Sequence, residues 1–425
     1  MVELILFGTF SFVAIGVLLS GMILYARRRL VSSAPCHIGI NQNEELSKTV
    51  EGGKTLLLTL AENGIALPSP CGGKATCKQC RVRVVKGGGD ILETDRASFS
   101  PKELKDGWRL SCQCKVKNDL ELKIPESLLT LREFRGTVIS NENVATFIKE
   151  LVLSLSDEDG VDYIPGDYLQ VHVPSHETNT ENWKETIEDK YYHDWKVFQL
   201  FGRAISFEAG EGEVIRAYSM ASYPAEKNRI KFNVRIATPP MVRGKISKEI
   251  PWGICSSYLF HLKKGDQVKL SGPFGESHMI NDEREVVFLI GGAGSSFGRS
   301  HILDLFKEKE TKRKVTLWYG ARSLKENIYQ EDYEELEKEF DNFYYELVLS
   351  EPADEDLDQG WPRDDPLKTN YLFKAFEIGQ LKKMEEPENC LYFVCGPPLH
   401  NSSVTKLLDD YGVPRENIIL DDFGS

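Results

Sequence analysis

The sequence predicts a multidomain protein with four parts: one N-terminal transmembrane helix, a small α+β domain, an antiparallel β-barrel and a doubly wound α/β domain. Three observations predict this order. A charge-free apolar run covers Leu4 to Tyr25, four distinctively spaced cysteines lie between Cys71 and Cys112, and strand and helix patterns alternate from about Glu283 onward. The expected domain boundaries are 1–30, 31–131, 132–282 and 283–425.

The first part is a candidate membrane anchor. A helix over Leu4 to Tyr25 is long enough to span roughly 30 Å of hydrocarbon. Arg27, Arg28 and Arg29 follow it, whereas a cleavable signal peptide carries its positive charge before the apolar run. This charge order predicts a single pass with everything after Arg29 in the cytoplasm, although a signal peptide remains the alternative.

The second part carries a candidate iron–sulfur site. Four thiols follow the pattern Cys71-x5-Cys77-x2-Cys80 with Cys112 farther on, one residue longer in its first gap than the plant-type ferredoxin spacing. A structural zinc site usually has two short cysteine pairs, and disulfides do not suit nine scattered cysteines in an acidic chain. We therefore expect these four thiols to hold a [2Fe–2S] cluster, with Cys114 as the rival for the fourth ligand.

The third part is rich in strands, such as Tyr168 to Val173 and Arg229 to Ile236, and is interrupted by an apparent insertion from Ser175 to Phe201. Two stretches in this part suit a flat, phosphorylated cofactor. In the first, an Arg suits a pyrophosphate, a Tyr suits ring stacking and a Ser can donate a hydrogen bond. The second stretch has a glycine and hydroxyl residues, which predict a helix N-terminus suited to a phosphate. The residues are Arg216, Tyr218 and Ser219, then Gly253, Ser256 and Ser257.

The fourth part alternates strands and helices, with strands expected at Glu285 to Ile290 and Phe343 to Leu349. A glycine-rich loop, Gly291 to Gly294, lies between the first strand and a helix expected from Phe297 to Glu308. Such a loop is where a dinucleotide pyrophosphate meets backbone N–H groups and the helix dipole. Cys395-Gly396-Pro397-Pro398 follows another strand of the same sheet, where ligands collect.

These motifs, in this order, resemble the ferredoxin–NADP reductase superfamily, and the front domain resembles a β-grasp [2Fe–2S] ferredoxin. The whole chain resembles the family of F subunits of the Na⁺-translocating NADH:quinone oxidoreductases. Its glycine loop departs from that family's Gly-Gly-Gly-Ala-Gly-Met-Ala-Pro, because Ser295 and Ser296 follow a shorter glycine run.

The resemblance implies a role for each motif residue. Arg216, Gly253, Ser256 and Ser257 would hold the phosphates of FAD, Tyr218 would stack on its flavin ring, and Ser219 would contact flavin N5. The nucleotide side of the site would flank NADH, with Cys395 near the nicotinamide and Phe423 covering the flavin face until nicotinamide displaces it. The NADH-flanking residues are Gly291, Gly292, Gly294, Cys395, Gly396 and Pro397.

The implied activity is NADH oxidation on FAD and onward transfer of single electrons through the cluster to partner membrane subunits of a Na⁺-pumping complex, with a quinone such as ubiquinone as indirect acceptor. The implied location is the bacterial inner membrane, with the catalytic domains in the cytoplasm. NADH is favoured over NADPH because Glu326, Glu331 and Asp332 accompany Arg322 and Lys325 after the second strand. The net charge of −13 argues against a nucleic-acid partner. The alternatives are the reductase of a multicomponent oxygenase and a non-enzymatic membrane-anchored ferredoxin.

Overall fold

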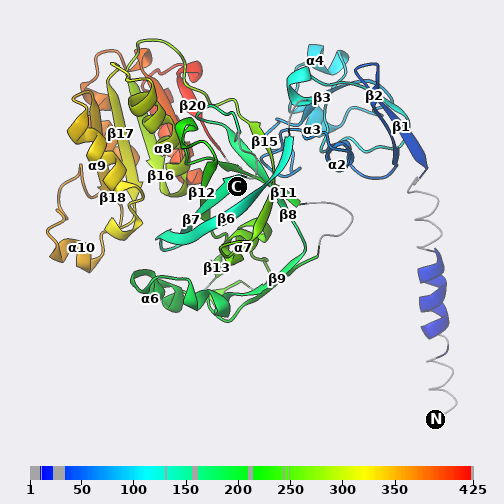
Figure 1. Cartoon of the computed structure of the whole chain (residues 1–425), viewed down its shortest axis with the longest axis horizontal. Helices are drawn as coiled ribbons and strands as arrows, with labels where there is room; N and C mark the ends of the chain where they lie inside the picture. Colours follow the sequence, from blue (N-terminus) through cyan, green and yellow to red (C-terminus); the bar gives the residue numbers. More distant parts are fainter. Residues whose placement is uncertain are drawn as a thin grey trace. The chain divides into compact units, whose positions relative to one another are not determined.

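The computed structural model describes residues 10, 12–22, 34–129, 132–155, 161–208, 214–242, 245–247 and 249–422. These residues form two compact units, one holding Gly73–Thr130 and the chain up to Leu67, the other holding Pro68–Gly72 and Leu131–Ser425 (Figure 1). The predicted span Leu4 to Tyr25 lies only partly within the described residues, of which 12–22 are helical. Among the described residues, no helix has the length and apolar character needed to cross a membrane.

The first unit is a mixed sheet of five strands in the order β2-β1-β5-β3-β4. Helix α2 begins at Leu56 because the side chain of Thr55 caps it, accepting a hydrogen bond from the amide of Leu58. Its core packs Leu56 and Leu60 against the sheet. The elements are β1 (Pro35–Ile40), β2 (Asn43–Glu51), α2 (Leu56–Glu62), β3 (Arg81–Lys86), α3 (Glu93–Arg96), α4 (Pro101–Lys105), β4 (Trp108–Leu110), β5 (Leu120–Lys123) and α5 (Glu126–Leu129).

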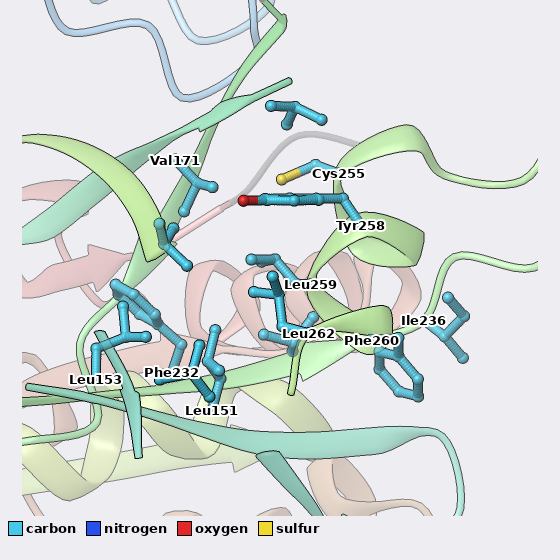
Figure 2. Close-up of a cluster of buried hydrophobic side chains, with 14 of the residues drawn as sticks. Leu151, Leu153, Val171, Phe232, Ile236, Cys255, Tyr258, Leu259, Phe260 and Leu262 are labelled. Carbon is cyan, nitrogen blue, oxygen red and sulfur yellow. The ribbon is translucent and has the colours of Figure 1, made fainter. Parts of the chain in front are cut away.

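The second unit begins with an antiparallel sheet of six strands in the order β11-β8-β15-β6-β7-β12. Its two ends are joined by a bridge between Met220 and Phe232, which closes the sheet into the expected barrel. Figure 2 shows Leu259 and Leu262 of the helical segment directed toward the strand residues Leu151 and Phe232. The elements are β6 (Arg132–Ala145), β7 (Ile148–Leu155), β8 (Tyr168–Val173), β11 (Val214–Ser219), β12 (Arg229–Arg235), α7 (Ile254–His261) and β15 (Gln267–Phe274).

The insertion between β8 and β11 folds onto the barrel. Trp183, Tyr191 and Trp195 are buried in the same core as the barrel strands, so the aromatic residues of this otherwise polar stretch are structural. Its elements are β9 (His176–Asn179), η1 (Thr180–Glu185), α6 (Asp189–Val197) and β10 (Ala204–Phe207). A short hairpin follows farther on, with strands β13 (Met241–Val242) and β14 (Lys245–Ile246).

The second unit ends with a parallel sheet in the order β18-β17-β16-β19-β20, which is the doubly wound arrangement the sequence predicts. Alternate residues of β16 face opposite sides of the sheet: Phe288 packs with the helices α8 and α9, and Leu289 packs with α11 and α12. The main elements are β16 (Val286–Gly291), α8 (Ser295–Leu303), β17 (Val315–Ala321), η5 (Leu324–Glu326), α9 (Gln330–Glu339), β18 (Phe343–Leu349), α10 (Asp354–Asp358), α11 (Leu372–Gly379), β19 (Leu391–Cys395), α12 (Pro398–Asp410) and β20 (Ile418–Leu420).

The helix expected from Phe297 to Glu308 begins two residues earlier and changes form within its length. Helix α8 starts at Ser295, directly after the turn Gly292–Gly294, and becomes a π-helical turn over Asp304–Glu308. The early start brings the first amides of α8 to the glycine loop, where the sequence predicts the dinucleotide.

Candidate redox site

The cysteine loop before β3 has a backbone suited to wrapping a ligand. Gly72 and Gly73 have φ angles of 62° and 87°, and the non-glycine residues Ala75 and Lys78 also have positive φ, 65° and 58°. Positive φ at an alanine and a lysine is a strained conformation, which is typical of ligand-binding loops. This conformation fits the turn that a cluster between Cys71 and Cys80 requires.

The structure brings two of the four predicted ligands into contact and separates the rival thiol from them. Cys80 and Cys112 are buried together with Phe99 and Leu110, whereas Cys114 belongs to the main core of the unit. A hydrogen bond with Cys112, followed by burial, strongly raises the pKa of Cys80. Cys71 is buried and Cys77 is partly exposed on the loop. Within the described part of the chain, no three His, Cys, Asp or Glu side chains are arranged to hold a metal ion.

Strand β11 carries the three residues predicted for the flavin. The ring of Tyr218 packs against Phe232 with centroids 5.9 Å apart, and burial, reinforced by Cys255, raises the pKa of its hydroxyl well above 10. The Arg216 guanidinium donates to the carbonyl of Ile215, at 2.7 Å. A partly buried tyrosine beside an arginine fits a flat ring with an attached phosphate.

Helix α7 starts where the sequence expects it, with Gly253 as the N-cap and without a side-chain cap. A Cβ at Gly253 would lie 2.6 Å from the Cβ of Ala237, so the close approach of this turn requires glycine. The hydroxyls of Ser256 and Ser257 donate to the carbonyl of Gly253, at 3.1 and 2.8 Å. The two hydroxyls thus stabilise the first turn, and the backbone amides there are the groups suited to a phosphate.

The end of the chain brings a carboxylate to the flavin side of the site. The Ser219 hydroxyl donates to the Asp421 carboxylate, at 2.8 Å, although 202 residues separate them in sequence. Asp421 follows β20 and donates its amide to the carbonyl of Val394, next to Cys395. Burial, with contributions from Asp421 and Asp422, raises the pKa of the Cys395 thiol well above 9. Ser219 and Cys395 therefore share one charged neighbour; Phe423 lies outside the described residues.

Asp421 makes the stability of the protein depend on pH. Burial raises the pKa of its carboxyl from 3.8 to about 6, so the folded state is stabilised by this group at low pH and loses that contribution as the pH rises through 6. We expect Asp421→Asn to raise the free energy of unfolding by about 1–2 kcal/mol at pH 8, with the gain vanishing near pH 4. Urea unfolding between pH 4 and pH 8 measures this difference, and a gain that does not change with pH would contradict it.

A pocket of about 360 Å³ opens at the carboxyl ends of the parallel strands. Its lining includes Gly291 and Gly292 after β16 and Pro397 after β19, as the sequence predicts for the dinucleotide. The barrel closes the other side of the pocket with Phe147 and Ile148. A polar loop, a helix N-terminus and an apolar wall are the parts that a dinucleotide site needs.

The remaining predicted nucleotide residues, Gly294, Cys395 and Gly396, are not among those that line this pocket. A Cβ at Gly294 would lie 2.4 Å from the carbonyl oxygen of Cys395, and one at Gly396 would lie 2.6 Å from the ring of His400. Ser295 and Ser296, the departure from the family pattern, hydrogen-bond to Asn233 of β12: Ser295 Oγ accepts from the side-chain amide, at 2.7 Å, and Ser296 Oγ accepts from the backbone amide, at 3.2 Å. The two serines thus attach the loop to the barrel.

Two arginines in the pocket were not predicted as binding residues. Arg235 ends β12 and Arg322 follows β17, and both line the pocket. Burial, together with the charge of Arg322, lowers the pKa of Arg235, so this pair of cations favours an anionic ligand. Asp421 was also not predicted. The sequence places Arg322 after a strand, which is a signal, but no local pattern indicates Arg235 or Asp421.

Three domain families match the chain in the predicted order. The 2Fe-2S iron-sulfur cluster binding domain matches residues 40–117, the oxidoreductase FAD-binding domain 197–279, and the oxidoreductase NAD-binding domain 288–404. The fold and its site therefore define an oxidoreductase that binds a [2Fe–2S] cluster, FAD and NADH.

Two similar relatives identify the family within this class of oxidoreductases. The F subunit of the Na(+)-translocating NADH-quinone reductase of Chlamydia pneumoniae is 60% identical over 415 residues, covering 97% of this chain and 96% of its own. The protein of the same name from Marinomonas sp. (strain MWYL1) is 45% identical over 421 residues, covering 99% and 98%. The chain belongs to the family of Na⁺-translocating NADH-quinone reductase F subunits.

Solved structures support the fold alone. The Amycolatopsis cytochrome P450 reductase GcoB has a TM-score of 0.60 at 20% identity and covers 91% of this chain and 98% of its own. The ferredoxin reductase in carbazole 1,9a-dioxygenase has a TM-score of 0.57 at 20% identity, covering 92% and 99%. Both are similar in fold across the ferredoxin-like and reductase parts.

Proposed function

We propose that this chain is the NADH-oxidising subunit of a Na⁺-translocating NADH:quinone reductase. NADH is oxidised in the second unit, and single electrons leave through the cysteine site to membrane partner subunits, with a quinone as the indirect acceptor. The observation that carries the proposal is the convergence of Ser219, Asp421 and Cys395 next to the strand ends that line the dinucleotide pocket. The membership of the chain in this family supports the same assignment.

The cofactors supply the electron chemistry and the protein supplies position and charge. When bound, FAD takes two electrons from NADH and releases them singly, and the [2Fe–2S] cluster carries one at a time. Arg216 and the first amides of α7 would bind the FAD phosphates, and Tyr218, which packs against Phe232, would stack on the flavin ring. Ser219 would contact the N5 region of the flavin, and its hydroxyl is oriented by the hydrogen bond that it donates to Asp421.

The nucleotide side of the site orients NADH against the flavin. The amides of Gly292 to Ser295 and the Arg235 guanidinium suit the pyrophosphate. Gly294 packs tightly against Cys395, since a Cβ at Gly294 would lie 2.4 Å from the Cys395 carbonyl oxygen, and this contact would fix the glycine loop beside the end of β19. The predicted role of Phe423 at the flavin face remains part of this proposal.

Cys71, Cys77, Cys80 and Cys112 bind the cluster in this proposal. The buried contact between Cys80 and Cys112 supports it, because two thiols packed together are costly to ionise unless a metal compensates their charge. The expected division of the chain at residues 30, 131 and 282 remains part of the same proposal.

The N-terminal helix anchors the protein in the bacterial inner membrane as a single pass, with the catalytic domains in the cytoplasm. The helical residues between Phe10 and Met22 support this, since eight large apolar side chains there are at least 51% exposed. We expect removal of residues 1–33 to move the protein from the membrane fraction to the soluble fraction without changing the rate at which NADH bleaches the flavin. Membrane retention of the truncated protein would contradict the anchor.

The function is tested by purifying the protein from its host membrane in mild detergent. The proposal predicts co-purification with a multi-subunit complex whose NADH:quinone reductase activity depends on Na⁺. An oxygenase component in the purified complex would instead identify the chain as an oxygenase reductase, and a protein that holds the cluster but no flavin would leave only an anchored ferredoxin.

A further inference from the structure

The insertion between β8 and β11 reaches the nucleotide-binding part of its unit. Its helix α6 carries Asp194, whose carboxylate pairs with the Lys325 ammonium in η5, at 2.5 Å. Tyr191 of the same helix donates its hydroxyl to the Lys325 carbonyl, at 3.4 Å. Helix α6 is thereby attached to the segment that follows β17, although the two are far apart in sequence.

A second set of bonds fixes the same segment through the turn between β6 and β7. Trp195 of α6 donates its indole N–H to the carbonyl of Thr146, at 2.6 Å. Thr146 in turn donates its amide to the Glu326 carboxylate, at 3.2 Å, and its hydroxyl bonds to Glu326. One network of hydrogen bonds and an ion pair around Lys325 and Glu326 therefore joins the insertion, the turn between β6 and β7, and η5.

This contact lies at the place where dinucleotide-binding folds distinguish NADH from NADPH. In these folds, residues following the second strand of the sheet meet the adenosine ribose, with an acid on the 2′-hydroxyl or a cation on the 2′-phosphate. The second strand here is β17, and Arg322 and Glu326 after it line the pocket. Lys325 lies in the same segment and is the other cation that a 2′-phosphate would attract.

Both cations of the segment that follows β17 already have a carboxylate partner within the protein. Lys325 is paired with Asp194, and Arg322 is 3.4 Å from the Glu326 carboxylate and lies over the Phe147 ring, at 5.7 Å. A 2′-phosphate entering here would meet one compensated arginine, one compensated lysine and a nearby carboxylate. A 2′-hydroxyl carries no charge and is not affected by this arrangement.

We propose that Asp194, a residue of the insertion, determines dinucleotide specificity by holding Lys325 away from the 2′-position of the adenosine ribose. This inference rests on the proposed function and names a role for the insertion within it. Asp194 acts through Lys325 and is a positioning residue.

The test compares single and double variants of the detergent-purified protein. Asp194→Asn frees Lys325, and we expect the NADPH/NADH ratio of kcat/KM to rise about tenfold, which is the effect of one added charge-assisted phosphate contact. The double variant Asp194→Asn with Lys325→Met should return the ratio to the wild-type value. Glu181→Gln is the matched control, because Glu181 is a carboxylate of the same insertion that pairs within it, with Lys184.

A binding readout separates specificity from general damage to the fold. Inhibition by 2′,5′-ADP should strengthen about tenfold in Asp194→Asn, while inhibition by 5′-AMP stays unchanged, since only the 2′-phosphate gains a partner. An unchanged NADPH/NADH ratio in Asp194→Asn would overturn the inference, as would an equal rise in Glu181→Gln or in the double variant. Wild-type protein that NADH fails to reduce would instead overturn the proposed function.

Discussion

Replacing Cys112 by serine abolishes the electron paramagnetic resonance signal of the [2Fe–2S] cluster, while NADH still bleaches the flavin at close to the wild-type rate. Cys112 is buried against Cys80 in the first unit, whereas the nucleotide pocket belongs to the second. Loss of one thiolate removes the cluster or its function, and we expect electron transfer beyond the flavin to fall at least about a hundredfold. In anaerobic reduction by NADH, the flavin absorbance measures hydride transfer to the flavin. The paramagnetic resonance signal measures electron transfer onward to the cluster.

Cys114→Ser is the control for this prediction. Cys114 is two residues from Cys112 and equally buried, but it packs with the main core, where burial raises the pKa of its thiol to about 11. We expect this variant to keep the cluster signal and to lose some stability, because a buried hydroxyl replaces a thiol. Loss of the cluster only in Cys114→Ser would overturn the ligand assignment.

Replacing Gly294 by alanine disrupts the contact between the glycine loop and Cys395 at the end of β19. The added Cβ would lie 2.4 Å from the carbonyl oxygen of Cys395 and 2.9 Å from its sulfur, so the loop or β19 must move. Overpacking of this kind costs about 1–3 kcal/mol of stability. A displacement of about 1 Å at the reacting groups lowers a rate by about a hundredfold. Stopped-flow reduction of the flavin by NADH and thermal unfolding measure both losses.

Gly291→Ala is the matched variant in the same loop. The nearest atom to its Cβ is 3.6 Å away, which is ordinary contact, so we expect no loss of stability. Gly291 lines the pocket, and the methyl group should therefore raise the KM for NADH without lowering the melting temperature. Equal destabilisation by Gly291→Ala and Gly294→Ala would contradict the assigned role of the Gly294 contact.

Local patterns in the sequence predicted the elements that carry the site. Strands β8 and β18 have the bounds expected from their apolar pattern, and α7 begins after the glycine that marks its start. The glycine loop after β16 was predictable because a buried strand, a tight turn and a helix start are all local signals. The parallel, doubly wound character of the sheet follows from the alternation of strands and helices.

The parts of the site that the sequence did not predict depend on contacts between residues far apart in the chain. The Ser219–Asp421 bond, the Arg235 side of the pocket and the Asp194–Lys325 pair each join segments that no periodicity connects. The insertion was predicted as a polar interruption of the barrel, but its tryptophans are core residues. Burial of an aromatic residue depends on the surface it meets, which a single sequence does not specify.

The order of electron transfer tests the central claim most directly. Rapid mixing of anaerobic protein with NADH, followed by flavin absorbance and freeze-quenched paramagnetic resonance, resolves the two centres in time. The account predicts that the flavin bleaches first, that cluster reduction follows, and that protein depleted of FAD shows no cluster reduction by NADH. Reduction of the cluster by NADH at an unchanged rate in the FAD-depleted protein would contradict it.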